Sequence, residues 1–134
     1  MKTSALLMRG LISLLLLGSM NMAVVADEDG QLEVSADTFS CIRDMTKVRG
    51  FYVDNLKGNL EGTLVVANST TGGVYPPGSV VQLVPGEVMV KHEAGYSPAT
   101  KGWEFFELDV SEEGSEIRKR GFVDVVNRFD GNCF

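Results

Sequence analysis

Histidine, cysteine and tryptophan are nearly absent from this chain. Its 134 residues include one histidine (His92), two cysteines (Cys41 and Cys133) and one tryptophan (Trp103). A single histidine excludes a zinc site built from several histidines, and no Gly-x-Ser-x-Gly nucleophile elbow is present. These two absences argue against a hydrolase. His92 stands among alternating valines, so we expect a hydrogen-bonded core or rim histidine and not a metal ligand.

Basic residues are also scarce. The chain has 12 Lys and Arg against 18 Asp and Glu, a net charge of −6. This balance argues against a nucleic-acid partner, whose phosphates require clustered positive charge. The one basic run, Arg118 to Arg120, is interpreted as a solvated strand end. Carboxylates are plentiful, but their spacing does not single out a catalytic pair.

Long apolar runs are missing except at the start of the chain. Lys2 and Arg9 precede the nearly unbroken apolar stretch 11–17, and Ala26 closes a segment of small residues before an acidic run. This arrangement is typical of a signal peptide over residues 1–26. The stretch is too short to span a bilayer comfortably, since about 20 residues are needed. We therefore expect export to the periplasm or the exterior, with no membrane segment after cleavage.

The two cysteines allow two different interpretations. In an oxidising compartment Cys41 and Cys133 can pair, closing a loop of about 90 residues that is worth about 4–5 kcal/mol in the chain-entropy model. Alternatively, Cys133 followed by a single residue, Phe134, is how a Cys-x-x-Cys-His haem-attachment motif begins. In that case the second cysteine and the histidine lie beyond Phe134.

Hydrophobic periodicity predicts one helix near the N-terminus of the mature chain. Residues 27–36 are acidic and form a loose end. From Asp37 to Arg49, apolar residues recur at every third position, which is typical of an amphipathic helix, and Gly50 would end it. The periodic positions are Phe39, Ile42, Met45 and Val48.

The rest of the chain is predicted to form strands. The expected segments are 51–54, 60–67, 79–84, 87–93, 103–110 and 117–127, separated by turns rich in glycine and proline. Aromatic residues on both sides of the strand from Trp103 indicate that both of its faces are covered. The predicted fold class is α+β, mainly β: an N-terminal helix followed by a twisted antiparallel sheet of five or six strands.

Two sequence runs together carry a resemblance to a known family. Tyr75-Pro76-Pro77-Gly78-Ser79-Val80-Val81 is a Pro-Pro-Gly turn that enters a strand, and Gly102-Trp103-Glu104-Phe105-Phe106-Glu107-Leu108 is a strand rich in aromatic residues. With Cys133, they resemble the cytochrome P-460 family and its relative cytochrome c′-beta. The resemblance covers residues 37–134, which would be a single domain of this type, incomplete at its C-terminus.

The resemblance implies a cofactor, haem c, attached near the C-terminus. Cys133 would be the first thioether cysteine, and the axial histidine would follow Phe134. In members that oxidise hydroxylamine, a lysine is cross-linked to the porphyrin; Lys91 is a candidate, and Lys57 and Lys101 are alternatives. The carboxylate for proton transfer would be Glu87 or Glu93. On one face of their strand, Trp103 and Phe105 could wall an edge of the haem, although packing in the protein core is the simpler explanation for both.

The leading hypothesis is therefore a periplasmic c-type haem protein. It would act in electron transfer or small-gas binding, or less readily as a haem-dependent oxidoreductase acting on hydroxylamine. A redox protein or a small nitrogenous ligand would be its partner, and a homodimer is compatible with the resemblance. The alternative hypothesis is a haem-free exported binding or structural module stapled by a Cys41–Cys133 disulfide.

Overall fold

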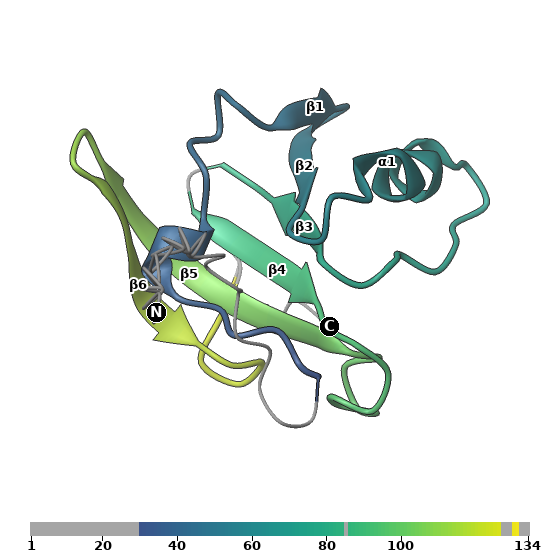
Figure 1. The fold of residues 1–134 in the computed structure, drawn as a ribbon. Coiled ribbons are helices and arrows are strands. Elements are labelled where there is room, and N and C mark those ends of the chain that lie inside the picture. Colours follow the sequence, from purple (N-terminus) through teal and green to yellow (C-terminus); the bar gives the residue numbers. More distant parts are fainter. Residues whose placement is uncertain (1–29, 85, 127–129, 132–134) are drawn as a thin grey trace, which may run out of the picture.

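A single antiparallel sheet organises the chain. The computed structural model describes residues 30–84, 86–126 and 130–131, so the signal peptide predicted over residues 1–26 lies outside the described residues. Six strands pair in chain order, each with the next (Figure 1). They are β1 (Thr46–Val48), β2 (Phe51–Asn55), β3 (Ser79–Gln82), β4 (Glu87–Lys91), β5 (Trp103–Ser111) and β6 (Gly114–Arg120). The predicted mainly β class and the antiparallel sheet are confirmed.

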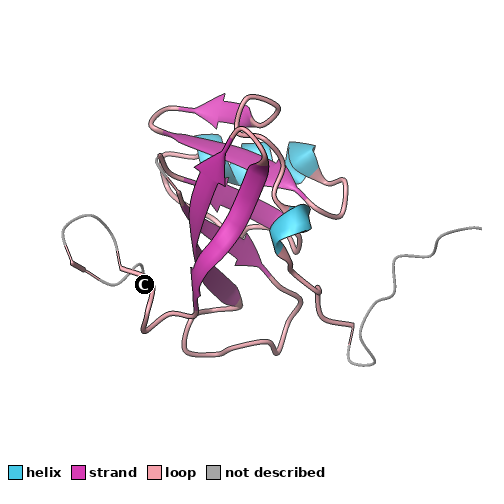
Figure 2. Cartoon of the chain, turned by 90° about the vertical axis from the view of Figure 1, so that its left-hand side faces the viewer, coloured by secondary structure: helices cyan, strands magenta, loops and turns pink. Residues whose placement is uncertain are grey.

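The two faces of the sheet carry separate hydrophobic clusters. Because successive side chains of a strand point to opposite faces, Val80 joins one cluster and Val81 the other. On β5, Phe105 is 3% and Phe106 0% exposed, which confirms that both faces of this strand are covered near its start. Figure 2 shows the twist of the strands in this sheet.

One face is covered by the N-terminal segment, but not by a helix. The helix predicted over residues 37–49 is wrong: the structure has one 3-10 turn, η1 (Ala36–Thr38), followed by loop and then β1. Phe39 and Met45 pack on the same face as Phe106, whereas Val48 belongs to the cluster on the opposite face. The apolar residues at every third position therefore pack into two different clusters and do not form one face of a helix.

The other face is covered by a helix that was predicted to be a strand. α1 (Leu60–Asn68) connects β2 to β3 and lies against β2 (Figure 1). The Asn59 side chain caps its N-terminus by accepting a hydrogen bond from the Gly62 amide at 3.1 Å. Leu60, Leu64 and Ala67 pack against the sheet. This one-sided burial at helical spacing outweighs the strand preference of the valines in the segment.

A buried asparagine fixes the helix to the sheet. Asn55, at the end of β2, donates from Nδ2 to Thr63 Oγ1 of α1 at 3.0 Å. Its Oδ1 accepts the backbone amides of Lys57 at 2.8 Å and Asn59 at 3.1 Å. Thr63 Oγ1 in turn lies 2.7 Å from Ser79 Oγ on β3. Every polar group in this contact is thereby matched, as burial requires.

The last strand, β6, is shorter than predicted and does not cover the start of β5. The sequence predicts a strand over 117–127, but β6 runs from Gly114 to Arg120 and residues 121–124 turn away. β6 pairs with β5 only from Phe106 to Ser111. The first residues of β5, Trp103 to Phe105, therefore extend past the end of β6.

Candidate functional site

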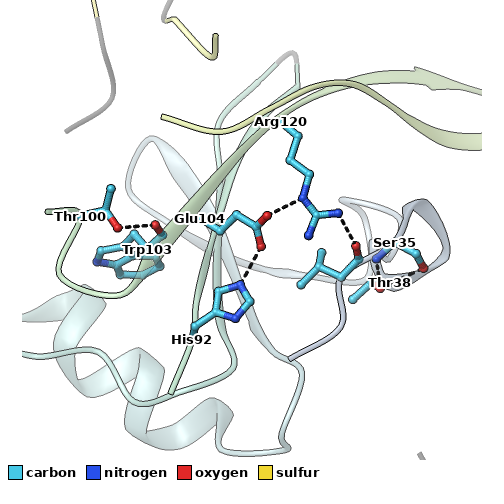
Figure 3. Close-up of polar contacts among 8 residues, drawn as sticks. Ser35, Thr38, His92, Thr100, Trp103, Glu104 and Arg120 are labelled. Carbon is cyan, nitrogen blue, oxygen red and sulfur yellow. Dashed lines mark hydrogen bonds and ion pairs between the residues drawn. The ribbon is translucent and has the colours of Figure 1, made fainter. Parts of the chain in front are cut away.

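Near the start of β5, a buried carboxylate joins three parts of the chain. Glu104 is 6% exposed, and its Oε2 accepts a hydrogen bond from Nε2 of His92, just beyond β4, at 2.7 Å. Its Oε1 accepts from Nε of Arg120, the last residue of β6. Arg120 also donates from Nη1 to the backbone carbonyl of Val34 at 3.1 Å. Figure 3 shows Glu104 between His92 and Arg120.

These contacts keep Glu104 ionised. Burial by itself would raise the pKa of Glu104, but the hydrogen bonds from His92 and Arg120 and the charge of Arg120 lower the pKa overall. The ring of Tyr96 stacks on His92, with 3.8 Å between centroids and planes 8° apart. Burial, followed by the charge of Glu104 and a hydrogen bond to it, raises the pKa of Tyr96. The site thus pairs an anionic carboxylate with a neutral phenol.

His92 is not placed as a metal ligand. Its ring is 2% exposed, Nε2 is engaged by Glu104, and Nδ1 is buried without a hydrogen-bond partner among the described residues. The expectation of a hydrogen-bonded core histidine is confirmed. Across the described part of the chain, His, Cys, Asp and Glu side chains form no group of three that could hold a metal ion.

A hollow of about 310 Å³ opens beside Glu104, at the edge of β5 that β6 leaves unpaired. We call it the aromatic hollow, because four aromatic side chains contribute to its wall. Its lining residues are Tyr96, Ser97, Thr100, Trp103, Glu104, Phe105, Gly121 and Phe122. The backbone amide of Gly121 donates to the Phe105 carbonyl at 2.9 Å, which holds the C-terminal segment against this edge. The result is a recess at the edge of β5 whose lining includes aromatic residues and one acidic residue, Glu104.

A second hollow of about 340 Å³ is lined by Lys91 and Tyr75, both of which contact the Trp103 ring, and we call it the lysine hollow. Lys91 and Lys101 contribute the positive charges of its lining, with Tyr75, Pro77 and Pro98 among the apolar residues. Tyr75 packs edge-on against Trp103, with 5.3 Å between ring centroids. Ser97 lines both hollows, so the two recesses are neighbours.

The candidates taken from the family resemblance are distributed unevenly over these hollows. Trp103 and Phe105 both line the aromatic hollow. Lys91 lines the lysine hollow instead, where its Nζ donates to the Lys101 carbonyl and lies 5.6 Å from the centroid of the Trp103 ring. Cys133 lies outside the described residues.

The remaining candidates have other partners. Lys57 pairs with Glu93 at the surface. Glu87 lies opposite Glu107 in the β4–β5 register. Neither Glu87 nor Glu93 lines the aromatic hollow; the carboxylate there is Glu104.

Cys41 is exposed, and its thiol forms no disulfide with any described residue. Its pairing with Cys133, which is not among the described residues, stays a prediction.

Sequence reasoning missed the network around Glu104. Alternation along the strands places His92 on the same face as Val88 and Val90, as expected. That Glu104 also points to this face follows only from the β4–β5 register, in which Val90 lies opposite Glu104. Arg120 was grouped with a solvated basic run, yet it pairs with a buried carboxylate.

No protein-family profile, curated protein sequence or solved structure matches the chain. Among the described residues, no helix has the length and apolar character needed to cross a bilayer.

Proposed function

We propose that the chain belongs to an exported c-type haem protein of the cytochrome P-460 type, in which the aromatic hollow walls one edge of the macrocycle. The observation that carries the proposal is the composition of this hollow. Tyr96, Trp103, Phe105 and Phe122 are the aromatic residues of its lining, beside the start of β5 that extends past β6. Ligand sites of this kind are mostly apolar with few polar groups.

The residues present fit the apolar edge of a porphyrin. Gly121 and Phe122 line the hollow and begin the segment that leads to Cys133, eleven residues after Phe122. An extended segment of that length spans at most about 40 Å, so its length would allow Cys133 to reach the hollow. In the proposal, Cys133 would hold the haem through a thioether bond. Bound haem supplies a redox-active iron whose potential depends on its surroundings.

The surrounding residues have defined tasks in this proposal. The aromatic rings exclude water from the macrocycle edge, and Glu104 holds a fixed negative charge that His92 and Arg120 orient. Such a charge stabilises the oxidised iron relative to the reduced iron. Electron transfer or binding of a small gas ranks above hydroxylamine oxidation, because Lys91 lines the neighbouring hollow. Export to the periplasm remains part of the proposal.

The test is expression of the gene with its downstream codons in a host that matures c-type cytochromes. We expect a Soret band and haem that stays on the polypeptide after denaturation. Cys133→Ala should remove at least one of the two thioether bonds, detected by the pyridine haemochrome spectrum, whereas the matched variant Cys41→Ala should leave the spectrum unchanged. A haem-free product would refute the proposal. A haem-free product two protons lighter than the free-thiol mass would favour the Cys41–Cys133 staple instead.

A further inference from the structure

The lysine hollow contains a positive charge that no carboxylate of the described residues neutralises. The Lys91 side chain is half-buried in the hollow, and its contacts are the Lys101 carbonyl and the ring of Trp103. Burial lowers the pKa of Lys91, as expected for a cation removed from water without a counter-charge. In a protein with 18 acidic residues against 12 basic ones, an unneutralised, half-buried lysine calls for an explanation.

The fold holds this ammonium group in place. Gly102 adopts a φ of +82°, and a Cβ there would lie 3.0 Å from Lys91 Nζ. The glycine thus lets the loop turn and lets the lysine pass close to the backbone. On the other side of Lys91, the Gly78 amide donates to its carbonyl at 2.7 Å. One ammonium proton is used by the Lys101 carbonyl, so two of its three donors remain for a ligand.

The rest of the lining favours an anion with an apolar body. Lys101 adds a second positive charge, and the one carboxylate in the lining, Glu93, is paired with Lys57. The apolar wall is made by Val74, Tyr75, Pro77, Ala94 and Pro98. Tyr75 presents an aromatic surface on which a flat ring can pack.

We propose that the lysine hollow binds a small organic monocarboxylate, with the Lys91 ammonium as its charge partner and the Tyr75 side as the surface for its apolar body. The site is separate from the aromatic hollow, so this proposal stands independently of haem attachment. The carboxylate completes the hydrogen bonding of the ammonium group and restores charge balance beside Trp103. Charge-assisted hydrogen bonds of this kind are the stronger class in proteins.

Titration with benzoate tests the proposal, with benzamide as a neutral compound of the same shape. The signal is the fluorescence of Trp103, the one tryptophan of the chain, supported by amide shifts in a ¹⁵N-labelled sample. We expect saturable benzoate binding. The affinity for benzamide should be lower by a factor of about ten or more, which corresponds to the loss of one charged contact. The shifts should centre on Tyr75, Lys91 and Gly102 and not on Phe122.

Three lysine variants show which positive charge binds the carboxylate of benzoate. Lys91→Met should weaken benzoate binding about tenfold or more, and Lys101→Met should weaken it less, because the Lys101 side chain is exposed. Lys47→Met, on β1, should leave the affinity unchanged. Equal binding of benzoate and benzamide, absence of saturation, or an unchanged affinity in Lys91→Met would each overturn the proposal. The comparison of the two compounds on the wild-type protein decides the question even where Lys91→Met fails to fold.

Discussion

Replacing Glu104 by glutamine tests whether the buried carboxylate stabilises the domain. The substitution keeps the size of the side chain but removes its charge, and an amide offers one acceptor oxygen to two donors, His92 Nε2 and Arg120 Nε. The hydrogen bond to the buried His92 is worth about 1.5–3 kcal/mol, because its acceptor is charged. The contact with Arg120, whose side chain is 50% exposed, contributes about 0.2–1 kcal/mol because solvent screens it. We expect Glu104→Gln to lower the free energy of unfolding by about 2–3 kcal/mol at pH 7.

The effect should depend on pH with a defined sign. The pKa of Glu104 in the folded protein is lower than its ordinary value of 4.5. The carboxylate therefore contributes its full stabilisation above about pH 4.5, and this contribution is lost as the pH falls through the lowered folded pKa. The difference between wild type and Glu104→Gln should shrink correspondingly in acid. At a pH well below the folded pKa, the two proteins should unfold at similar urea concentrations.

Urea unfolding followed by Trp103 fluorescence and by circular dichroism measures both effects. A loss of 2–3 kcal/mol corresponds to a midpoint about 1–2 M lower in urea for a domain of this size. The matched control is Glu112→Gln, because Glu112 is exposed in the β5–β6 turn, and its change should stay within about 0.5 kcal/mol. A Glu104→Gln loss below about 0.5 kcal/mol, or a difference that does not shrink in acid, would show that the network contributes no net stability.

Two further substitutions test the packing of the sheet. Gly86→Ala should destabilise the protein by about 1–3 kcal/mol, because the new methyl would lie 2.3 Å from the Leu108 carbonyl oxygen. In the control Gly50→Ala the new methyl meets nothing within 4 Å, so the free energy of unfolding should stay within about 0.5–1 kcal/mol of wild type. Equal effects of the two substitutions would contradict the close approach of Gly86 to β5. Asn55→Ala should cost about 2–4 kcal/mol by leaving two backbone amides without their acceptor, whereas Asn68→Ala, at an exposed position, should cost less than about 1 kcal/mol. Thermal and urea unfolding measure both pairs, and a small loss in Asn55→Ala would mean that water replaces the side chain.

The sheet could be predicted from the sequence because its strands are bounded by strong turn signals. β3, β4 and β5 fall within about two residues of the expected segments, since Pro-Gly and glycine-rich turns separate runs of alternating apolar residues. The helix could not be placed correctly, because the patterns of residues 37–49 and 60–67 were both compatible with more than one structure. Residues 60–67 contain β-branched side chains typical of strands, yet Asn59 provides a helix cap and Leu60, Leu64 and Ala67 share one face.

The candidate site was harder to predict than the fold because it depends on register and not on local pattern. Trp103 and Phe105, two residues apart on one strand, were candidates for the wall of a haem site, and both line the aromatic hollow; their role toward a haem stays a prediction. Glu104, between them in sequence, points to the other face and gains its partners from β4 and from the end of β6. Tyr96 lies in the loop between β4 and β5, where no periodicity announces that its ring will stack on His92. Contacts of this type become visible only when the strands are aligned.

Trp103 connects the two proposed binding sites physically. Trp103 is among the residues that line the aromatic hollow, and the ammonium of Lys91, which lines the lysine hollow, lies 5.6 Å from the centroid of the Trp103 ring. The negative face of the indole stabilises that ammonium, so a carboxylate that neutralises Lys91 changes the electrostatic environment of a residue that walls the other hollow. If the two proposals hold, binding energies at the two sites are coupled, and the coupling is the same in either direction. Lys91 would then influence the haem not as a covalent ligand but as a charge whose compensation depends on the second ligand.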